Sequence, residues 1–542
     1  MKVIKHRLSN IVLMSWLVIC TVSCSSLLDE ELISDRTTDN YYVDDQGFED
    51  LVKSAYSLLR QIHRERDLVL LGTDVFTQNG DPALGGLGWL NEYSPQGINP
   101  QTGQVSTYWN TLYKAISRTN TVLDRAPAAN TQEGVKAIRV AEARFLRALY
   151  YFYLVEQFGD IPLVLQEITD VVTTAERAPE QEVYKQIVAD LEAAVSALPA
   201  EQEDYGRATK GAATHLLAKV YLTRGYKDFG EAGDFPSAAE LATTVIESPN
   251  YRLLDSFEEV FRQGNEVNDE IIFAVQYSSN AVINDWGSNA HSIFGEDVSG
   301  LIGMDRSSTY NRLQPRFVPT RFLNTLYNPS LDSRYDVTFL RLFLATVNQG
   351  DKQVGDTVLY FPRWDQPWSA ERMAAVNYLV VNLNEYYMNI EKFLQFPPLW
   401  KFFEAGLPYG DNLGTRDQFV FRLAETHLIA AEAYLQAGNA SQALEHINAV
   451  RRRAAISGME DQMELSSVTI DDILDERARE LCGEEPRWNE LKRTGKLIER
   501  VKLYNERASV ANLIQDFHLL RPIPLEQIER MTNDLPQNPG YN

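Results

Sequence analysis

Hydrophobic residues recur at helical spacing over several long stretches of the chain. Within residues 135–158, one face of the predicted helix carries the apolar residues Ile138, Ala141, Phe145, Leu149 and Phe152. Gly159 tolerates a positive φ just past the last turn, and Pro162 cannot continue a helix. The pattern therefore predicts a long amphipathic helix that ends near residue 158.

The same spacing predicts further helices over residues 45–62, 108–123, 184–198, 210–226, 235–248 and 421–438. Alanines within the predicted pairs let neighbouring helices approach closely, as in tetratricopeptide repeats, but the pairs are scattered and do not form a contiguous solenoid. Residues 250–415 are rich in loops, with strand-like runs at 270–277 and 357–361. We expect a mostly α fold with scattered tetratricopeptide-type helix pairs and a loop-rich region with short strands.

Charge and motif content narrow the classes of function. The formal net charge of −24 leaves no basic surplus to neutralise phosphates, which argues against a nucleic-acid partner. The chain has no H-E-x-x-H, G-x-S-x-G or G-x-x-x-x-G-K-[ST] motif, so we expect no enzyme and no metal site. We interpret Cys482 as a buried, inert thiol. We interpret the charged residues Glu476, Arg477, Arg479 and Arg487 as members of a structural ion-pair network.

Two segments of the chain resemble one family closely. Residues 141–164, AEARFLRALYYFYLVEQFGDIPLV, and the run from Ile470 to Arg493 are similar to signature segments of the SusD/RagB family. The closing motifs around Pro522 and Asn538 agree with this resemblance, although Glu485-Pro486 departs from the usual acid–glycine. The resemblance implies a SusD-like fold in a surface nutrient-binding lipoprotein of the outer membrane. It also implies a SusC-like TonB-dependent transporter as the partner.

The N-terminus reads as a secretory signal over residues 1–23, followed by a lipidated tether over 24–40. Basic residues precede an apolar run from Ile11 to Val22 that is too short to span a membrane. Cys24 resembles the acylated cysteine of a lipoprotein, although Thr21 stands where the motif usually has Leu. Lipidation would anchor the chain to the cell surface. We divide the rest into an N-terminal helical region, 41–260, and a C-terminal region, 261–542, packed as one globular unit.

A glycan site needs aromatic rings on loops, with polar groups nearby to bind hydroxyls. The Gly-rich segment 71–102 is a long loop that offers Asp74, Trp89, Asn91 and Tyr93, together with Asn79 and Asp81. The middle loops offer Trp286, Arg306 and Tyr310, together with Asn289. The resemblance supports these two regions but no individual residue. Trp364 and Trp368 are alternatives, and Trp89 is favoured because its glycine-rich flanks cannot bury it locally.

The leading interpretation is a protein that captures an oligosaccharide and passes it to the transporter, without cofactor. The sequence leaves open whether a structural calcium ion is bound. A RagB-like binder of oligopeptides is the first alternative, and a surface glycosidase with two carboxylates in a cleft is the second. A protein-binding repeat scaffold is disfavoured by the interrupted repeats. The strong acidity makes polyanionic glycans less favoured cargo.

Overall fold

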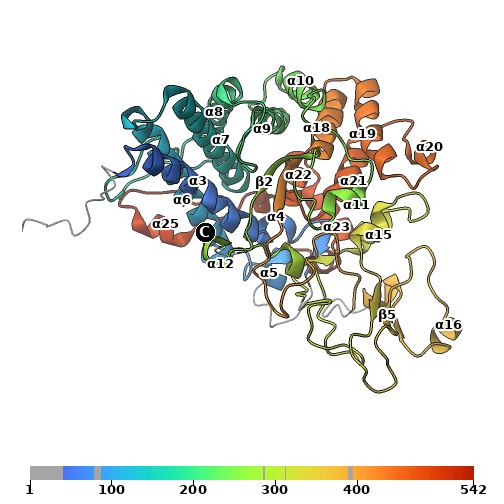
Figure 1. Cartoon of the computed structure of the whole chain (residues 1–542). Coiled ribbons are helices and arrows are strands. Elements are labelled where there is room, and N and C mark those ends of the chain that lie inside the picture. Colours follow the sequence, from blue (N-terminus) through green and yellow to red (C-terminus); the bar gives the residue numbers. More distant parts are fainter. Residues whose placement is uncertain (1–40, 79–86, 285–286, 312, 388–394, 542) are drawn as a thin grey trace, which may run out of the picture.

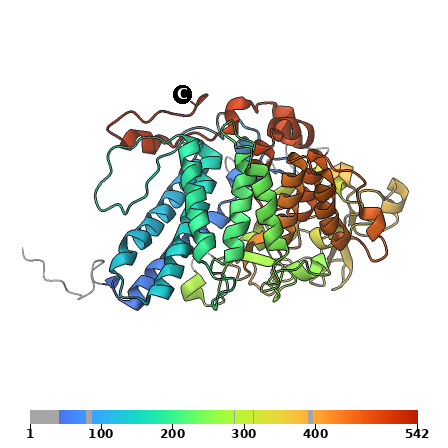
Figure 2. The same cartoon turned by 90° about the horizontal axis from the view of Figure 1, so that it is seen from above.

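The computed structural model of the chain describes residues 41–78, 87–284, 287–311, 313–387 and 395–541 (Figure 1). Its first half is built from long helices, as the hydrophobic pattern predicts. These are α3 (Asp45–Arg64), α6 (Gly103–Arg125), α7 (Glu133–Phe158), α8 (Glu180–Ala197), α9 (Lys210–Arg224) and α10 (Asp234–Ile246). Figure 2 shows them in a row with two helices from the second half, α18 (Leu423–Gln436) and α19 (Ala440–Ala454).

Helix α7 lies at the centre of this row. From Ala141 to Phe158 every residue except Arg144 is buried, so this part of the helix is covered on all sides and not only on its apolar face. Several polar groups have partners inside: the Tyr150 hydroxyl donates to Ala55 O over 2.7 Å, and Arg147 pairs with Asp190 over 2.8 Å. Gly159 ends the helix with φ 69°, as the sequence predicts.

Small side chains join the helix pairs. A buried alanine cluster lies among α9, α10 and α18, where α10 packs against both of the others. Its alanines are Ala218, Ala238, Ala239, Ala242, Ala430 and Ala433. Because an alanine keeps two helix axes close, the pairs pack in the manner of tetratricopeptide repeats. The predicted scattered helix pairs are therefore present.

Shorter helices build much of the second half. Those after α19 are α20 (Glu460–Met463), α21 (Ile470–Glu480), α22 (Arg487–Arg493), α23 (Leu497–Tyr504), α24 (Glu506–Ala511), the 3-10 turn η3 (Asp516–Leu519) and α25 (Leu525–Arg530). Those before α18 include α11 (Phe257–Phe261), α12 (Ala281–Asn284), α13 (Ala290–Ile293), α14 (Arg321–Leu326), α15 (Arg334–Thr338), α16 (Ala370–Ala374) and α17 (Leu383–Tyr386). Two very short helices, α4 (Asp67–Leu70) and α5 (Leu87–Asn91), and the 3-10 turn η2 (Ala126–Ala128) belong to the first half.

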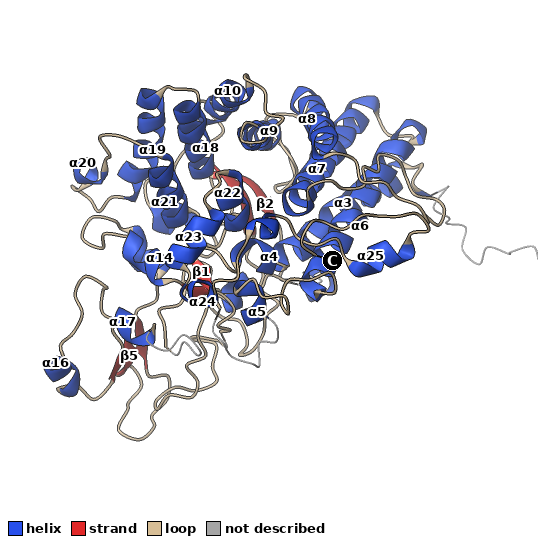
Figure 3. Ribbon diagram, turned by 180° about the vertical axis from the view of Figure 1, so that it is seen from behind, coloured by secondary structure: helices blue, strands red, loops and turns tan. Residues whose placement is uncertain are grey.

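Three small sheets complete the described part of the chain. β1 (Phe76–Thr77) pairs antiparallel with β3 (Val318–Pro319), and β2 (Ile271–Val275) pairs antiparallel with β7 (Gln418–Arg422). β5 (Thr357–Tyr360), labelled in Figure 3, lies between antiparallel β4 (Leu342–Leu344) and parallel β6 (Leu379–Val380). Its buried side chains belong to a small core separate from the largest one. The strand-like runs at 270–277 and 357–361 are thereby confirmed as β2 and β5.

The largest hydrophobic core contains side chains from both predicted regions, including Leu59, Leu149, Trp488 and Ile523. The boundary near residue 260 stays a prediction. In the described ranges no helix is long and apolar enough to cross a membrane. The predicted signal, Cys24 and tether lie outside the described residues.

The charged residues near the C-terminus form the predicted structural network. Arg334 is fully buried and pairs with Asp332 over 2.8 Å, Glu476 over 2.6 Å and Glu480 over 2.7 Å. Its neighbours Arg477, Arg479 and Arg487 pair with Glu485, Glu476 and Asp74 in the same way. Burial raises the pKa of the Cys482 thiol, as expected of a thiol without a reactive role.

Candidate functional site

Trp89 is the most exposed aromatic candidate that the structure describes. It lies on α5, whose Leu87, Leu90 and Asn91 are buried, while 54% of Trp89 itself is exposed. The backbone beneath the ring is fixed, because Ser94 donates to Trp89 O from its N–H over 3.0 Å and from its hydroxyl over 3.2 Å. A side chain on Gly97 would meet the Leu90 backbone nitrogen at 2.2 Å, so the returning chain can cross α5 only at a glycine. The ring is thus held in place and open to solvent.

Polar groups lie around the helix that carries Trp89. Arg507 of α24 pairs with Glu92, and its guanidinium lies 3.5 Å from the point where a Cβ on Gly88 would be. The amide oxygen of Gln78 lies 3.2 Å from the same point. Gln78 is 99% buried, and among the described residues its amide has no hydrogen-bond partner. An aromatic ring beside donors and acceptors is the arrangement that binds a sugar ring and its hydroxyls.

The other described candidates from the 71–102 segment are buried, so the prediction that they contact ligand is wrong for them. Asp74 is fully buried and pairs with Arg487 and Arg500. Burial alone would raise the pKa of Asp74, but the two guanidinium groups outweigh it and lower the pKa. Asn91 accepts from Gly72 N over 3.0 Å, and the Tyr93 hydroxyl donates to Gly72 O over 2.6 Å. These side chains hold the segment in place from inside.

This segment is therefore not one long exposed loop. It contains β1 and α5, and its inner residues are packed into the core. Asn79 and Asp81 lie outside the described residues. The contacts of Gln78, Glu92 and Arg507 were missed by sequence reasoning. Arg507 is more than 400 residues away along the chain, and no local pattern marks it as a neighbour of α5.

The middle loops place their candidates in a second aromatic group. The half-buried Tyr310 accepts from Leu344 N over 2.9 Å, and its ring centre lies 4.9 Å from that of Phe343 and 6.2 Å from that of Trp400. Trp400 stacks on Phe403 at 3.7 Å, and the exposed Arg306 lies 6.0 Å from the ring of Tyr409. In the described part of the chain no ring contact joins this group to Trp89. Trp286 lies outside the described residues.

The remaining candidates, Asn289, Trp364 and Trp368, have their side chains in contact with other protein groups. Asn289 is buried and donates to Arg64 O over 3.3 Å. The Trp364 indole donates to Tyr327 O over 2.9 Å. Trp368 is covered by the Arg372 guanidinium at 3.7 Å. These three residues act as packing side chains in the structure.

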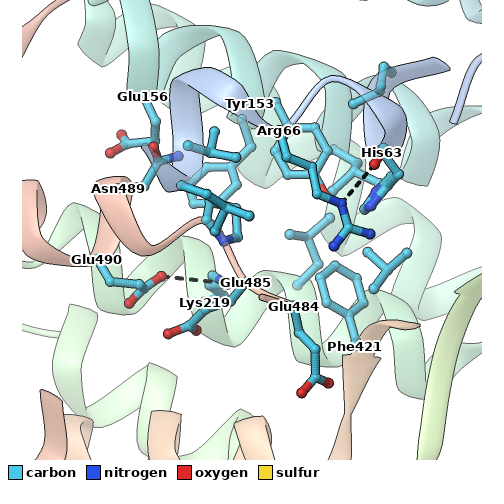
Figure 4. A pocket seen from close by; sticks show the side chains of 18 of the residues that line it. His63, Arg66, Tyr153, Glu156, Lys219, Phe421, Glu484, Glu485, Asn489 and Glu490 are labelled. Atoms are coloured by element: carbon cyan, nitrogen blue, oxygen red, sulfur yellow. Dashed lines mark hydrogen bonds and ion pairs between the residues drawn. The ribbon is translucent and has the colours of Figure 1, made fainter. Parts of the chain in front are cut away.

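A cavity lies among α3, α4, α7, α9 and α22 (Figure 4). It is lined by apolar and charged side chains, and one of the charged ones, Lys219, lies 3.4 Å from Glu490 of the lining and 2.6 Å from Glu425 behind it. Burial raises the pKa of Glu485 to about 7, whereas Arg477 and Arg493 overcome burial and lower that of Glu490. Two carboxyls with opposite pKa shifts are typical of acid–base catalysis. The cavity measures about 50 Å³, however, which has room for a few water molecules and not for a sugar ring.

The described residues contain no group of three or more His, Cys, Asp and Glu side chains that fits a metal ion.

Comparison with known proteins assigns the chain to a family. A family described as "Starch-binding associating with outer membrane" matches residues 28–222, and the SusD family matches residues 269–541. A SusD-like protein of Bacteroides ovatus is 26% identical over 89% of this chain and 82% of its own length. The starch-binding protein SusD of Bacteroides thetaiotaomicron is 26% identical over 82% of this chain and 80% of its own length.

Solved structures share the fold. A laminarin-binding SusD-like protein superposes with a TM-score of 0.71 at 25% identity, covering 92% of this chain and all of its own. Surface glycan-binding protein A of Bacteroides thetaiotaomicron, solved with laminarihexaose, gives a TM-score of 0.69 at 19% identity, over 91% of this chain and 99% of its own. At that identity the second likeness concerns the fold alone. With the family match spanning half of its length, the chain belongs to the SusD family, and the predicted SusD-like fold is confirmed.

Proposed function

We propose that this protein is a cell-surface lipoprotein that captures an oligosaccharide and passes it to a SusC-like TonB-dependent transporter. One observation carries the proposal: Trp89 is 54% exposed on a short helix whose other face is buried. Exposed tryptophan faces stack on the apolar C–H faces of sugars. The names of relatives that bind starch and laminarin support the same ligand class.

In this proposal the sugar ring lies on Trp89 while its hydroxyls reach the polar groups beside α5. Glu92 accepts hydrogen bonds from hydroxyls, and Arg507 donates them. No bond is made or broken, in keeping with the binding proteins among the relatives. We expect Tyr310 and Arg306, with the rings of Trp400 and Tyr409, to contact longer oligosaccharides.

Attachment to the membrane follows from the N-terminal sequence. Acylation of Cys24 would anchor the protein in the outer membrane, with which the family description associates it. The transporter is a partner that the family membership suggests. We propose that glycan binding needs no cofactor, and a calcium titration of the purified protein would test this.

The RagB-like alternative, capture of oligopeptides, uses the same fold. It is not favoured, because a peptide would require a row of unpaired backbone or amide groups along a groove, whereas the exposed feature here is an aromatic ring. A peptide library offered in the same titration separates the two ligands.

Isothermal titration of residues 25–542 against neutral malto- and laminari-oligosaccharides tests the proposal. We expect binding to the wild type, no cleavage of the sugar, and at least about tenfold weaker binding in Trp89→Ala, since about 1.4 kcal/mol corresponds to a factor of ten. Val171→Ala is the matched control, because Val171 is 89% exposed and lies outside the site. Binding that is unchanged in Trp89→Ala, or binding of peptides alone, would contradict the proposal.

A further inference from the structure

A hollow of about 180 Å³ lies where the C-terminal tail closes over residues 93–100. Its walls include four rings, those of Tyr93, Phe517, His518 and Tyr541, and its polar rim includes Asn99 and Gln515. None of the described residues that line it has a charged side chain, although 23% of the chain is charged. A ligand with a net charge would find no partner here, so the lining fits a neutral ligand.

The rings form one connected wall. The centres of Phe517 and His518 are 3.9 Å apart, Phe517 meets Tyr541 edge to face at 5.1 Å, and Tyr93 meets His518 at 5.4 Å. Gly540, with φ 86°, lets the tail approach closely, since a Cβ there would lie 2.4 Å from the Phe517 ring. The tyrosine hydroxyls are already used: Tyr93 donates to Gly72 O, and Tyr541 donates to Leu520 O over 2.8 Å.

His518 supplies a donor to this aromatic hollow. Its Nδ1 accepts from Gln515 N over 2.9 Å, which places the proton of the neutral ring on Nε2. Burial and the charge of Arg521 lower the pKa of His518 to about 4, so the ring is neutral at pH 7. Among the described residues Nε2 has no hydrogen-bond partner. It therefore remains available to a ligand.

We propose that this hollow binds one neutral pyranose ring, with the rings of Phe517, His518 and Tyr541 against its C–H faces and edges and the Nε2–H of His518 donating to a hydroxyl or ring oxygen. This inference rests on the proposed function and adds a second contact for the same cargo. Residues 94–97 connect the surface around Trp89 to the hollow. Ser94 N donates a hydrogen bond to Trp89 O, the chain crosses α5 at Gly97, and Pro95 lines the hollow. Two linked contacts would strengthen the capture of a chain that spans both.

The test uses saturation-transfer NMR on residues 25–542 carrying Trp89→Ala, so that the first surface is disabled. The probes are methyl glucoside, methyl galactoside and methyl mannoside, with methyl glucuronide as the charged probe and N-acetyl-tyrosinamide as the aromatic one. We expect transfer to at least one neutral pyranoside, weaker transfer to the glucuronide, and at least about tenfold weaker binding when His518→Asn is added. Asparagine keeps an acceptor for Gln515 N but lacks the ring and the Nε2–H.

A second variant, Phe517→Leu, removes one ring while keeping an apolar side chain, and it serves if His518→Asn does not fold. Val171→Ala in the same background is the control and should leave the transfer unchanged. Transfer that persists in both variants, or that occurs only to N-acetyl-tyrosinamide, would overturn the assignment. Absence of transfer while the wild type still binds oligosaccharides would overturn the second site alone, whereas a wild type that binds no glycan would overturn the proposed function itself.

Discussion

At the scale of single residues, burial decides which candidates can meet a ligand. Residue type and loop composition select Trp89, Asp74, Asn91 and Tyr93 alike, yet only Trp89 among these four is exposed. The sequence cannot separate them, because the partners that bury Asp74 are Arg487 and Arg500, more than 400 residues away. Fully buried carboxylates with two guanidinium partners are structural unless something opens the site.

Replacement of Asp74 tests this correction. Asp74→Ala leaves the buried Arg487 and Arg500 without their shared carboxylate, so we expect the free energy of unfolding to fall by about 3–5 kcal/mol. Urea unfolding followed by circular dichroism measures the loss, and Asp365→Ala, at an exposed aspartate, is the control. Unchanged stability combined with weaker glycan binding would return Asp74 to the list of ligand contacts.

Glu506 provides a pH-dependent test at the same scale. Burial raises its pKa to about 7, and its Oε2 is buried with no hydrogen-bond partner among the described residues. The folded protein therefore holds this proton more tightly than the unfolded chain. The stabilisation is complete below pH ~4.3, the ordinary glutamate pKa, and is lost as the pH rises through about 7.

Glu506→Gln should remove this pH dependence of the unfolding free energy, which amounts to at most about 4 kcal/mol. The difference in unfolding free energy between variant and wild type should shift in favour of the variant between pH 4.5 and 8. Glu499→Gln, at a side chain that is 58% exposed, is the control and should show no such shift. A pH-independent difference for Glu506→Gln would disprove the raised pKa.

At the scale of elements, periodicity predicts the long helices well and the short elements poorly. Helix α7 is fixed by its own apolar spacing and by Gly159, so the sequence alone gives its extent. Helix α5 has only five residues, and its position depends on α24, which lies far along the chain. Short helices are held by tertiary contacts, and a local pattern cannot show those contacts.

The end of α7 yields a test of a predicted element. Gly159 has φ 69° and ψ −126°, and a Cβ there would lie 3.2 Å from the side chain of Leu520. We expect Gly159→Ala to cost about 1–3 kcal/mol of stability, measured by urea unfolding. Gly233→Ala is the matched control, because its φ is −84° and its Cβ would meet nothing within 4 Å. Equal effects of the two substitutions would contradict this account of the helix end.

At the scale of the whole molecule, one large core joins the row of helices to the C-terminal segments. Leu149 of α7 and Trp488 of α22 share this core, and the tail returns to α7, where Arg521 N donates to Gln157 O over 2.7 Å. The fold class and the family could be recognised from sequence, because the family resemblance lies in α7 itself and in the run from Ile470 to Arg493, whose Asn489 accepts a hydrogen bond from Gln157 of α7. The arrangement of the loops around Trp89 could not be predicted from sequence, because it depends on packing between distant parts of the chain.

Glycan capture on Trp89 is tested most directly by a crystal structure of residues 25–542 with the neutral oligosaccharide that binds most tightly in solution. We expect an intact sugar with one pyranose ring in van der Waals contact, at about 4 Å, with the exposed face of Trp89. A sugar bound elsewhere with Trp89 uncovered would contradict the assigned surface. A cleaved sugar would contradict the proposal that the protein only binds.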